Sequence, residues 1–136
     1  MSIKVNGEWY DLNDFSNYKE IEEAGGIEET DDLPDGLSIA KYFDELCEYE
    51  EASADDRAIM MAYFENTGIL SLEEATDAYA GKYSSKGEFA QEYCEDNEST
   101  LKLLPDYIVD NIDWEGVWDS YLHWDFFESN GMFFRD

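Results

Sequence analysis

Carboxylates are the residues of this chain with the greatest capacity for chemistry. The 136 residues include 35 Asp and Glu, only 8 Lys and Arg, and a single histidine, His123, which gives a formal net charge of −27. Two carboxyl groups can act together as a general acid and a general base. Every segment of the chain offers such pairs, however, so none of them is singled out. His123 lies between Leu122 and Trp124 and is interpreted as a structural histidine. We therefore expect a protein without catalytic residues.

Acidic chains also invite a search for metal sites. A calcium-binding loop of the EF-hand type needs oxygen ligands at positions 1, 3 and 5, glycine at position 6 and a bidentate Glu at position 12. The segments around Gly36 and Gly116 come closest to this pattern, but they carry Tyr42 and Leu122 at the twelfth position. The sequence therefore predicts no dedicated metal site and no cofactor.

Cys47 and Cys94 each lie in a helical pattern and show no CxxC spacing. Such cysteines are typical of small buried hydrophobic residues in a reducing compartment. The first residues lack the apolar core of a signal peptide, and no apolar run approaches the ~20 residues that span a membrane. We expect a cytoplasmic protein that does not contact membranes.

The negative charge is spread along the whole chain. Residues 1–33, 34–68, 69–103 and 104–136 carry net charges of −8, −7, −5 and −7, and aromatic residues make up 16% of the sequence. Acidic tails concentrate their charge, and acidic disordered chains are poor in aromatic residues. The sequence therefore predicts a folded body that is negative over its whole surface.

The expected charge density approaches that of DNA. A compact protein of this mass exposes roughly 7,000 Å², or about one net negative charge per ~270 Å². Double-stranded DNA carries about one charge per ~100 Å². Such a surface repels nucleic acid phosphates and anionic lipid, so we expect no direct binding to nucleic acid. Solubility, or adaptation to a high-salt cytoplasm, is an alternative explanation of the charge.

The elements that must carry these carboxylates are short. The dipeptides Asn6-Gly7 and Asn130-Gly131 predict a hairpin near each end of the chain, because a type I′ turn needs positive φ at both positions. Gly25-Gly26 and the polar stretch through Asp35-Gly36 read as a loop. Periodicity and capping residues predict helices over 14–23, from Ser38, from Ser53 to Gly68, from Ser71 to Gly81, from Ser85, and from Pro105 through Tyr121. The predicted fold is α+β and dominated by helix. We divide it into segments 1–36, 37–70 and 71–136, the first with a hairpin and a helix, the other two helical, and the last closing with a hairpin.

Several short motifs in the second half of the chain resemble one family. They are Ser71–Ala75, Ala78–Ser85, Glu88–Glu92, Leu104-Pro105 into Ile108, Ile112–Glu115 with Asn111 before it where the family has Tyr, and Phe126–Phe134. In order and spacing, residues 69–134 resemble the ArdA-type antirestriction proteins of plasmids and conjugative elements. Residues 37–68 fit more loosely, and the first 36 fit least, as if the N-terminal domain were reduced.

The resemblance implies a non-enzymatic DNA mimic. Proteins of this type are elongated homodimers of small domains, and their carboxylates imitate the phosphates of a bent duplex. The implied partner is a type I restriction–modification enzyme, whose DNA-binding groove the mimic occupies. An acidic protein-binding or cation-binding module without antirestriction activity is the alternative.

The predicted binding residues are carboxylates off the apolar stripes of the helices. They are Glu73, Glu74, Asp77, Glu88, Glu92, Glu95, Asp96, Asp106, Asp110, Asp113, Glu115, Asp119 and Asp125. Each could equally be an ordinary solvated side chain, so the prediction concerns the set. The candidates for dimer contacts, with simple core packing as the alternative, are Trp114, Trp118, Tyr121 and Phe133.

Overall fold

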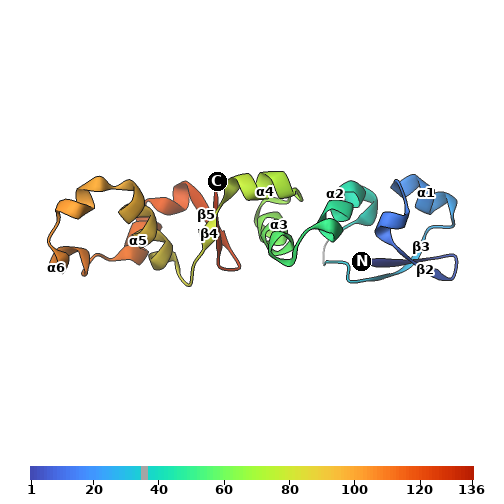
Figure 1. The fold of residues 1–136 in the computed structure, drawn as a ribbon, viewed down its shortest axis with the longest axis horizontal. Coiled ribbons are helices and arrows are strands. Elements are labelled where there is room, and N and C mark those ends of the chain that lie inside the picture. Colours follow the sequence, from blue (N-terminus) through green and yellow to red (C-terminus); the bar gives the residue numbers. More distant parts are fainter. Residues whose placement is uncertain (35–36) are drawn as a thin grey trace.

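The computed structural model describes residues 1–34 and 37–136 and has the shape of a rod (Figure 1). One end is formed by the N-terminal sheet and α1, and the other by α6, while the C-terminus lies near the middle. The accessible surface of 8423 Å² exceeds the roughly 7,000 Å² expected of a compact protein of this mass. The fold is α+β and dominated by helix, as predicted, with two small antiparallel sheets.

The first sheet has the strand order β2-β1-β3, with β1 at Ser2–Val5, β2 at Glu8–Asp11 and β3 at Ile27–Asp31. Asn6 and Gly7 join β1 to β2 with φ of 52° and 82°, which confirms the predicted hairpin. Residues 25–36 were expected to form a loop, but β3 lies within them and pairs with β1. β3 is an edge strand with an exposed surface, so its side chains are mostly polar. Its sequence, Ile-Glu-Glu-Thr-Asp, is too polar for a strand to be predicted from it. Asp35 and Gly36, from the same predicted loop, lie outside the described residues.

The helices begin largely where their capping residues predict. The elements of this part are the 3-10 turn η1 at Leu12–Asp14, α1 at Tyr18–Glu23, α2 at Ile39–Glu51, α3 at Ala54–Thr67, α4 at Leu72–Ala78 and α5 at Lys86–Asn97. Ser38, Ser53, Ser71 and Ser85 each accept a hydrogen bond from the backbone N–H three residues on, as N-cap residues do. Among the described residues, no helix is both long enough and apolar enough to span a bilayer.

The predicted helix from Ser71 to Gly81 ends earlier than expected. It stops at Ala78, and Tyr79–Lys82 form strand β4, which pairs with the C-terminal strand β6. Gly81 has a φ of +131°, and a Cβ built there would lie 2.9 Å from the ring of Tyr83. Gly81 therefore serves a bend in the strand. β4 has only four residues, and its partner strand lies some fifty residues further along the chain. The neighbouring sequence therefore does not indicate the strand.

The helix predicted from Pro105 through Tyr121 is interrupted. It divides into α6 at Asp106–Val109 and α7 at Trp114–Ser120, with Asp113 as the N-cap of α7. The other elements of this part are the 3-10 turns η2 at Ser99–Leu103 and η3 at Leu122–Trp124, and the strands β5 at Phe126–Ser129 and β6 at Met132–Arg135. The turn between β5 and β6 confirms the second predicted hairpin, with φ of 54° at Asn130 and 80° at Gly131.

Three apolar clusters follow one another through the molecule. The first joins the N-terminal sheet to α1 and α2, and it includes Met60 of α3. The second lies between α3 and one face of the sheet β4-β6-β5, around Ala62 and Phe134. The third packs α5 and α7 against the other face of that sheet, around Phe89 and Phe133. Phe133 and Phe134 reach different clusters because successive side chains of a strand point to opposite faces.

Helix α3 belongs to two of these clusters. Met60 and Ala62 are both fully buried, Met60 in the first cluster and Ala62 in the second. A helix that is apolar on two sides joins the N-terminal part of the rod to the rest. The first cluster also takes residues from both sides of the predicted boundary at residue 36. The predicted division into three segments stays a prediction.

Replacing Met60 tests whether α3 couples the two parts of the rod. We expect Met60→Ala to lower the free energy of unfolding by about 2–5 kcal/mol, because it leaves a cavity in a packed core. Urea denaturation gives this value, and amide hydrogen exchange at Ile3 and Phe134 reports on the first and second clusters. Protection should fall at both residues together. Asn66→Ala, at an exposed position of α3, is the control and should change stability by less than about 0.5 kcal/mol. A loss confined to Ile3 would contradict the coupling.

Candidate functional site

The carboxylates of this surface are largely unpaired. Among the residues that the structure describes, the one ion pair within 4.0 Å joins the N-terminal amine of Met1 to Glu50. One of the few cations, the half-buried Arg57, binds backbone carbonyl groups instead. The guanidinium group of Arg57 donates to the carbonyl oxygens of Tyr49 and Glu50 at the end of α2. With 8423 Å² of surface and a net charge of −27, the protein exposes about one net negative charge per 310 Å².

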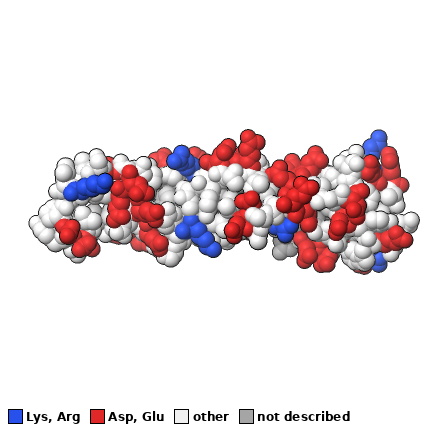
Figure 2. Space-filling model, viewed as in Figure 1, with Lys and Arg blue, Asp and Glu red and all other residues white. Residues whose placement is uncertain are grey.

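All thirteen predicted binding carboxylates are exposed. Helix α4 carries Glu73, Glu74 and Asp77, and helix α5 carries Glu88, Glu92, Glu95 and Asp96. Helix α6 begins with Asp106 and is followed by Asp110. The others lie at or on α7 (Asp113, Glu115 and Asp119) and just before β5 (Asp125). The face drawn in Figure 2 carries acidic side chains from one end of the rod to the other, with few basic groups between them. Exposure alone does not distinguish a binding surface from a solvated one, so the spacing of the groups matters.

Helix α5 carries the most regular group of carboxylates. Glu88, Glu92 and Asp96 recur every four residues, so they share one side of the helix and advance roughly 6 Å per step. Burial raises the pKa of the Tyr83 phenol, and the negative charges of Glu92, Asp96 and Glu88 raise it further. The three carboxylates therefore share one side of the helix and act on one hydroxyl group, and we call them the α5 row.

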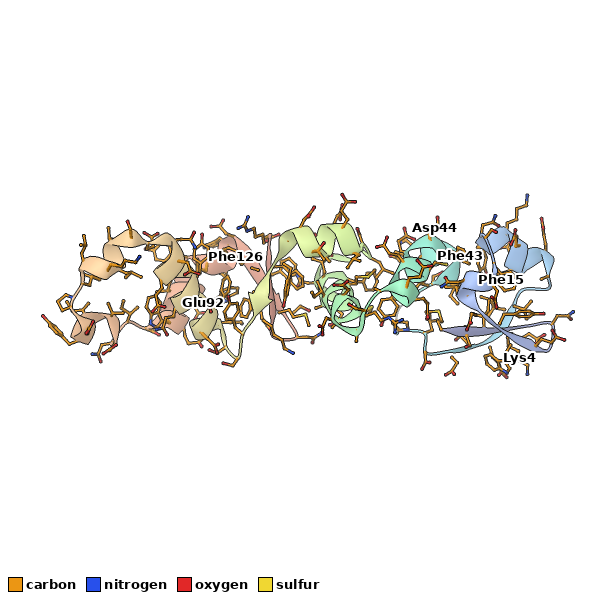
Figure 3. All side chains as sticks on the ribbon, in the orientation of Figure 1. Lys4, Phe15, Phe43, Asp44, Glu92 and Phe126 are labelled. Atoms are coloured by element: carbon orange, nitrogen blue, oxygen red, sulfur yellow. The ribbon has the colours of Figure 1, made fainter. Side chains whose placement is uncertain are left out.

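A second group of carboxylates surrounds a pocket of about 320 Å³ between α2 and the start of α4. Glu45 and Glu48 come from α2 and Glu74 from α4, and the backbone N–H of Leu72 donates to the Glu48 carboxylate over 3.0 Å. Glu45 and Glu48 were absent from the predicted set. Their place off the apolar stripe of α2 was visible in the sequence, but their approach to α4 depends on tertiary packing. Figure 3 shows the polar and apolar sides of α2: Asp44 points away from the rod and Phe43 points toward its interior.

Two predicted carboxylates also hold the C-terminal part together. Asp113 accepts a hydrogen bond from the N–H of Gly116 at the start of α7. Glu115 accepts one from the N–H of Gly87 over 2.9 Å and so joins α7 to the start of α5. A Cβ at Gly87 would lie 2.9 Å from the Glu115 carboxylate, so glycine allows the close approach. Replacing either acid would change structure as well as charge.

The predicted dimer contacts divide into buried and exposed residues. Trp118 and Phe133 are 4% and 1% exposed within the third cluster, so they are core residues that offer no surface to a partner. Trp114 is half-buried against the same cluster. Tyr121 is 73% exposed and remains available for contact.

An exposed apolar surface at the α6 end of the rod was not predicted. It consists of Leu103, Leu104, Tyr107 and Ile108, with Leu103 83% and Tyr107 71% exposed. We call these four residues the end patch. The sequence signal was present, because these residues follow no amphipathic stripe that would bury them. Tyr107 and Ile108 fall within the helix predicted from Pro105, whereas Leu103 and Leu104 precede it.

Groups capable of catalysis are scattered through the structure. His123 is exposed, its Nδ1 lies 3.1 Å from the carbonyl oxygen of Trp118, and its ring packs beside Trp124. Burial and nearby carboxylates raise the pKa of the Cys47 thiol, and burial and Glu98 raise that of Cys94. A raised pKa disfavours the reactive thiolate. Within residues 1–34 and 37–136, no group of three or more His, Cys, Asp or Glu is arranged to hold a metal ion.

Comparison of the chain with protein-family models, with curated proteins and with solved structures finds no match.

Titration of Tyr83 tests the negative field of the α5 row. We expect the phenol to ionise above the ordinary value of about 10, first because of burial and then because of Glu92, Asp96 and Glu88. Glu92→Gln should lower this pKa, whereas Glu73→Gln on α4 should leave it unchanged. The difference in phenolate absorbance between each protein and its Tyr83→Phe counterpart isolates the signal.

The same shift makes stability depend on pH. Because the folded-state pKa is raised, the contribution of Tyr83 is complete below about pH 10 and is lost as pH rises through the folded value. Tyr83→Phe should therefore lose less stability than the wild type in that range, as measured by thermal unfolding. Equal losses in the two proteins would contradict the shift.

Proposed function

We propose that this chain is a DNA mimic that occupies the DNA-binding groove of a type I restriction–modification enzyme and inhibits it. The observation that carries the proposal is the uncompensated negative charge along the whole rod. Exposed carboxylates occur from α1 to Asp125, just before β5, and one ion pair occurs among the described residues. A solubilising surface needs no rod and no regular spacing, whereas a substitute for a duplex needs both.

The charge density and the spacing support the proposal in magnitude. One net charge per about 310 Å² is within about a factor of three of the density on a DNA surface. DNA carries one phosphate per strand every ~3.4 Å of axis. The α5 row advances roughly 6 Å per carboxylate, so it offers about one charge for every second phosphate of a strand.

The mechanism is competition for a basic groove. Lys and Arg side chains that hold phosphates would meet carboxylates instead, and complementary fields would steer the two proteins together. Such attraction is screened by salt over a Debye length of about 10 Å at 0.1 M. The resemblance of residues 69–134 to ArdA-type proteins supports the choice of a type I enzyme as the target.

We further propose that two copies of the chain associate through the end patch. Exposed apolar side chains gathered in one place are a common mark of a protein contact, and the four residues of the end patch are near neighbours in sequence at one extremity of the rod (Figure 1). Contact there would align two rods end to end and roughly double the length of the acidic surface. Both halves could then bind one groove, and affinity would gain from the high effective concentration of the second half.

Inhibition of cleavage is the test of the proposed function. We expect near-stoichiometric protein to block cleavage of unmodified plasmid by a purified type I restriction enzyme, and higher salt to weaken the block. An unrelated protein of equal net charge is the control for non-specific effects. Equal inhibition by that control, or none by this chain, would leave an acidic protein-binding or cation-binding module as the better description.

A matched pair of variants separates the predicted surface from charge in general. Glu73→Gln, Glu88→Gln and Glu92→Gln together should weaken inhibition by about tenfold or more, since contacts of up to about 1 kcal/mol each accumulate. Glu22→Gln, Glu23→Gln and Glu29→Gln remove the same charge from the N-terminal end and should have a smaller effect. Equal losses in the two triple variants would contradict the predicted set.

Oligomeric state tests the end patch. We expect the wild type to sediment as a dimer and the double variant Leu103→Asp, Tyr107→Asp to sediment as a monomer, because two carboxylates would have to be buried at the contact. Trp9→Asp places a charge at an exposed residue of the opposite end and should leave the dimer intact. A wild type that remains monomeric at high protein concentration would refute this contact.

A further inference from the structure

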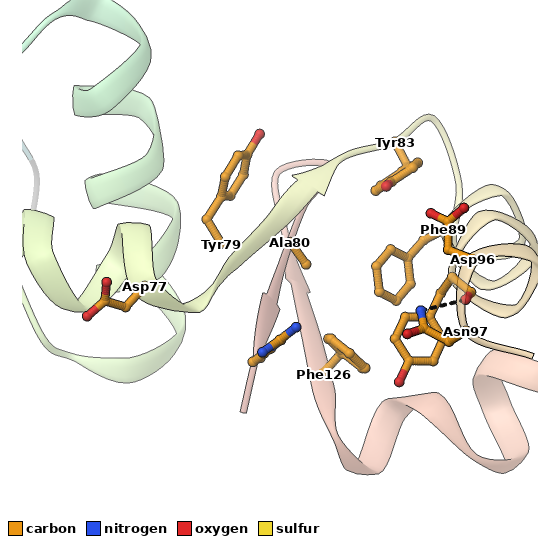
Figure 4. Close-up of a pocket in the computed structure, with 10 residues that line it drawn as sticks. Asp77, Tyr79, Ala80, Tyr83, Phe89, Asp96, Asn97 and Phe126 are labelled. Carbon is orange, nitrogen blue, oxygen red and sulfur yellow. Dashed lines mark hydrogen bonds between the residues drawn. The ribbon is translucent and has the colours of Figure 1, made fainter.

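A pocket of about 360 Å³ lies between the sheet β4-β6-β5 and the C-terminal half of α5. Among the residues that line it, Figure 4 shows Ala80 on β4, Phe89 and Phe126 close together beside it, and Asp96 and Asn97 on α5. Its volume is at the lower end of the range for small-ligand sites, roughly 300–1,000 Å³. The pocket therefore fits a single side chain or another small group rather than a peptide strand.

The wall of this pocket is formed by aromatic rings that pack against one another. Phe89, Tyr93 and Phe126 contact one another, with ring centroids 5.1–6.0 Å apart. Tyr83 packs edge-on against Phe89 at 5.3 Å. Phe89 and Phe126 are almost completely buried and fix the wall, while Tyr83 and Tyr93 remain partly exposed at the opening. The faces of such rings attract cations.

The opening of the pocket is negatively charged. Asp96 borders it as the last member of the α5 row, and Asp77 borders it from the end of α4. Both carboxylates are exposed. In Figure 4 they lie on opposite sides of strand β4. A group that enters would meet aromatic rings within the pocket and carboxylates around it.

We propose that this pocket receives the arginine side chain of a target protein, with its guanidinium group against the tyrosine rings and hydrogen-bonded to Asp96. Arginine suits the site because its planar, weakly hydrated cation stacks on aromatic rings and pairs with carboxylates in a fixed geometry. The identity of the target rests on the proposed function, but the chemistry of the pocket does not. The surrounding carboxylates would bring the two proteins together, and the pocket would fix one position.

Replacing Arg135 gives a second test of the pocket, because this residue carries the same charge as the proposed ligand. It lies opposite Phe126 in the β5–β6 pairing and lines the same pocket. Within the described residues, its guanidinium group has no carboxylate within 4.0 Å. An entering cation would therefore be repelled by Arg135, and its removal should strengthen binding. If the pocket bound an anion instead, removing Arg135 should weaken binding.

The direct experiment titrates the full-length protein with N-acetylarginine methylamide at constant ionic strength, followed by NMR. We expect saturable shifts at Tyr83, Tyr93 and Asn97, and none with the neutral citrulline analogue. Asp96→Asn should weaken binding by about fivefold or more, because it removes a charge-assisted hydrogen bond. Glu95→Gln removes the same charge one residue away, where it borders a different pocket, and should weaken binding less than about twofold. Arg135→Gln should strengthen it.

The outcomes separate this inference from the proposed function. If the probe does not bind, or if Asp96→Asn and Glu95→Gln weaken it equally, the arginine site is wrong whether or not the protein inhibits restriction. If Arg135→Gln weakens binding, the pocket does not select cations and the inference is likewise wrong. If the probe binds as expected but cleavage is not inhibited, the site is supported and the proposed target fails.

Discussion

The fold depends on apolar packing that must withstand the mutual repulsion of unpaired carboxylates along a thin body. Self-repulsion on this scale opposes compaction, and each cluster in the rod is enclosed by one small sheet and only a few short helices. Aromatic residues offset this, because a large ring buries much apolar area for each residue used. In the third cluster Phe89 and Phe133 stack at 4.5 Å, and Trp118 packs edge-on against both. Helix α3 then links the first two clusters, so neither part of the rod relies on its own core alone.

The carboxylates contribute to the fold through backbone donors. Glu28 accepts from the N–H of Gly7, Glu115 from that of Gly87, and Glu128 from that of Gly131, each at a turn or a helix start. The first two contacts join separate segments, and all three satisfy backbone donors that would otherwise need water. They also leave the negative charge uncancelled, which an ion pair with Lys or Arg would not. A strongly negative surface can therefore still be structurally connected by its acids.

The sequence predicted what is decided locally and missed what is decided by distant pairing. Serine caps and the Asn-Gly turns were recognised because a few neighbouring residues determine them. Strands β3 and β4 were missed because each is short and polar or glycine-containing, and each pairs with a strand far along the chain. The exposure of the predicted carboxylates followed from helical periodicity. The aromatic pocket did not, because Tyr83, Tyr93 and Phe126 come from three separate segments that only the sheet brings together.

Charge and shape would have different parts in recognition by such a surface. A smooth negative field attracts a basic groove toward the rod from any direction. The energy of this attraction changes little when the groove is displaced slightly along the axis of the rod. Specific register needs contacts that are lost when the position is wrong, as buried or charge-assisted contacts are. The end patch offers one such constraint, because a contact there would determine where the acidic surface of one copy ends and that of another begins. The pocket beside Asp96 offers a second, at the end of the α5 row. Because it combines an aromatic wall with a carboxylate at its edge, it can discriminate between positions that the surrounding field treats as equal.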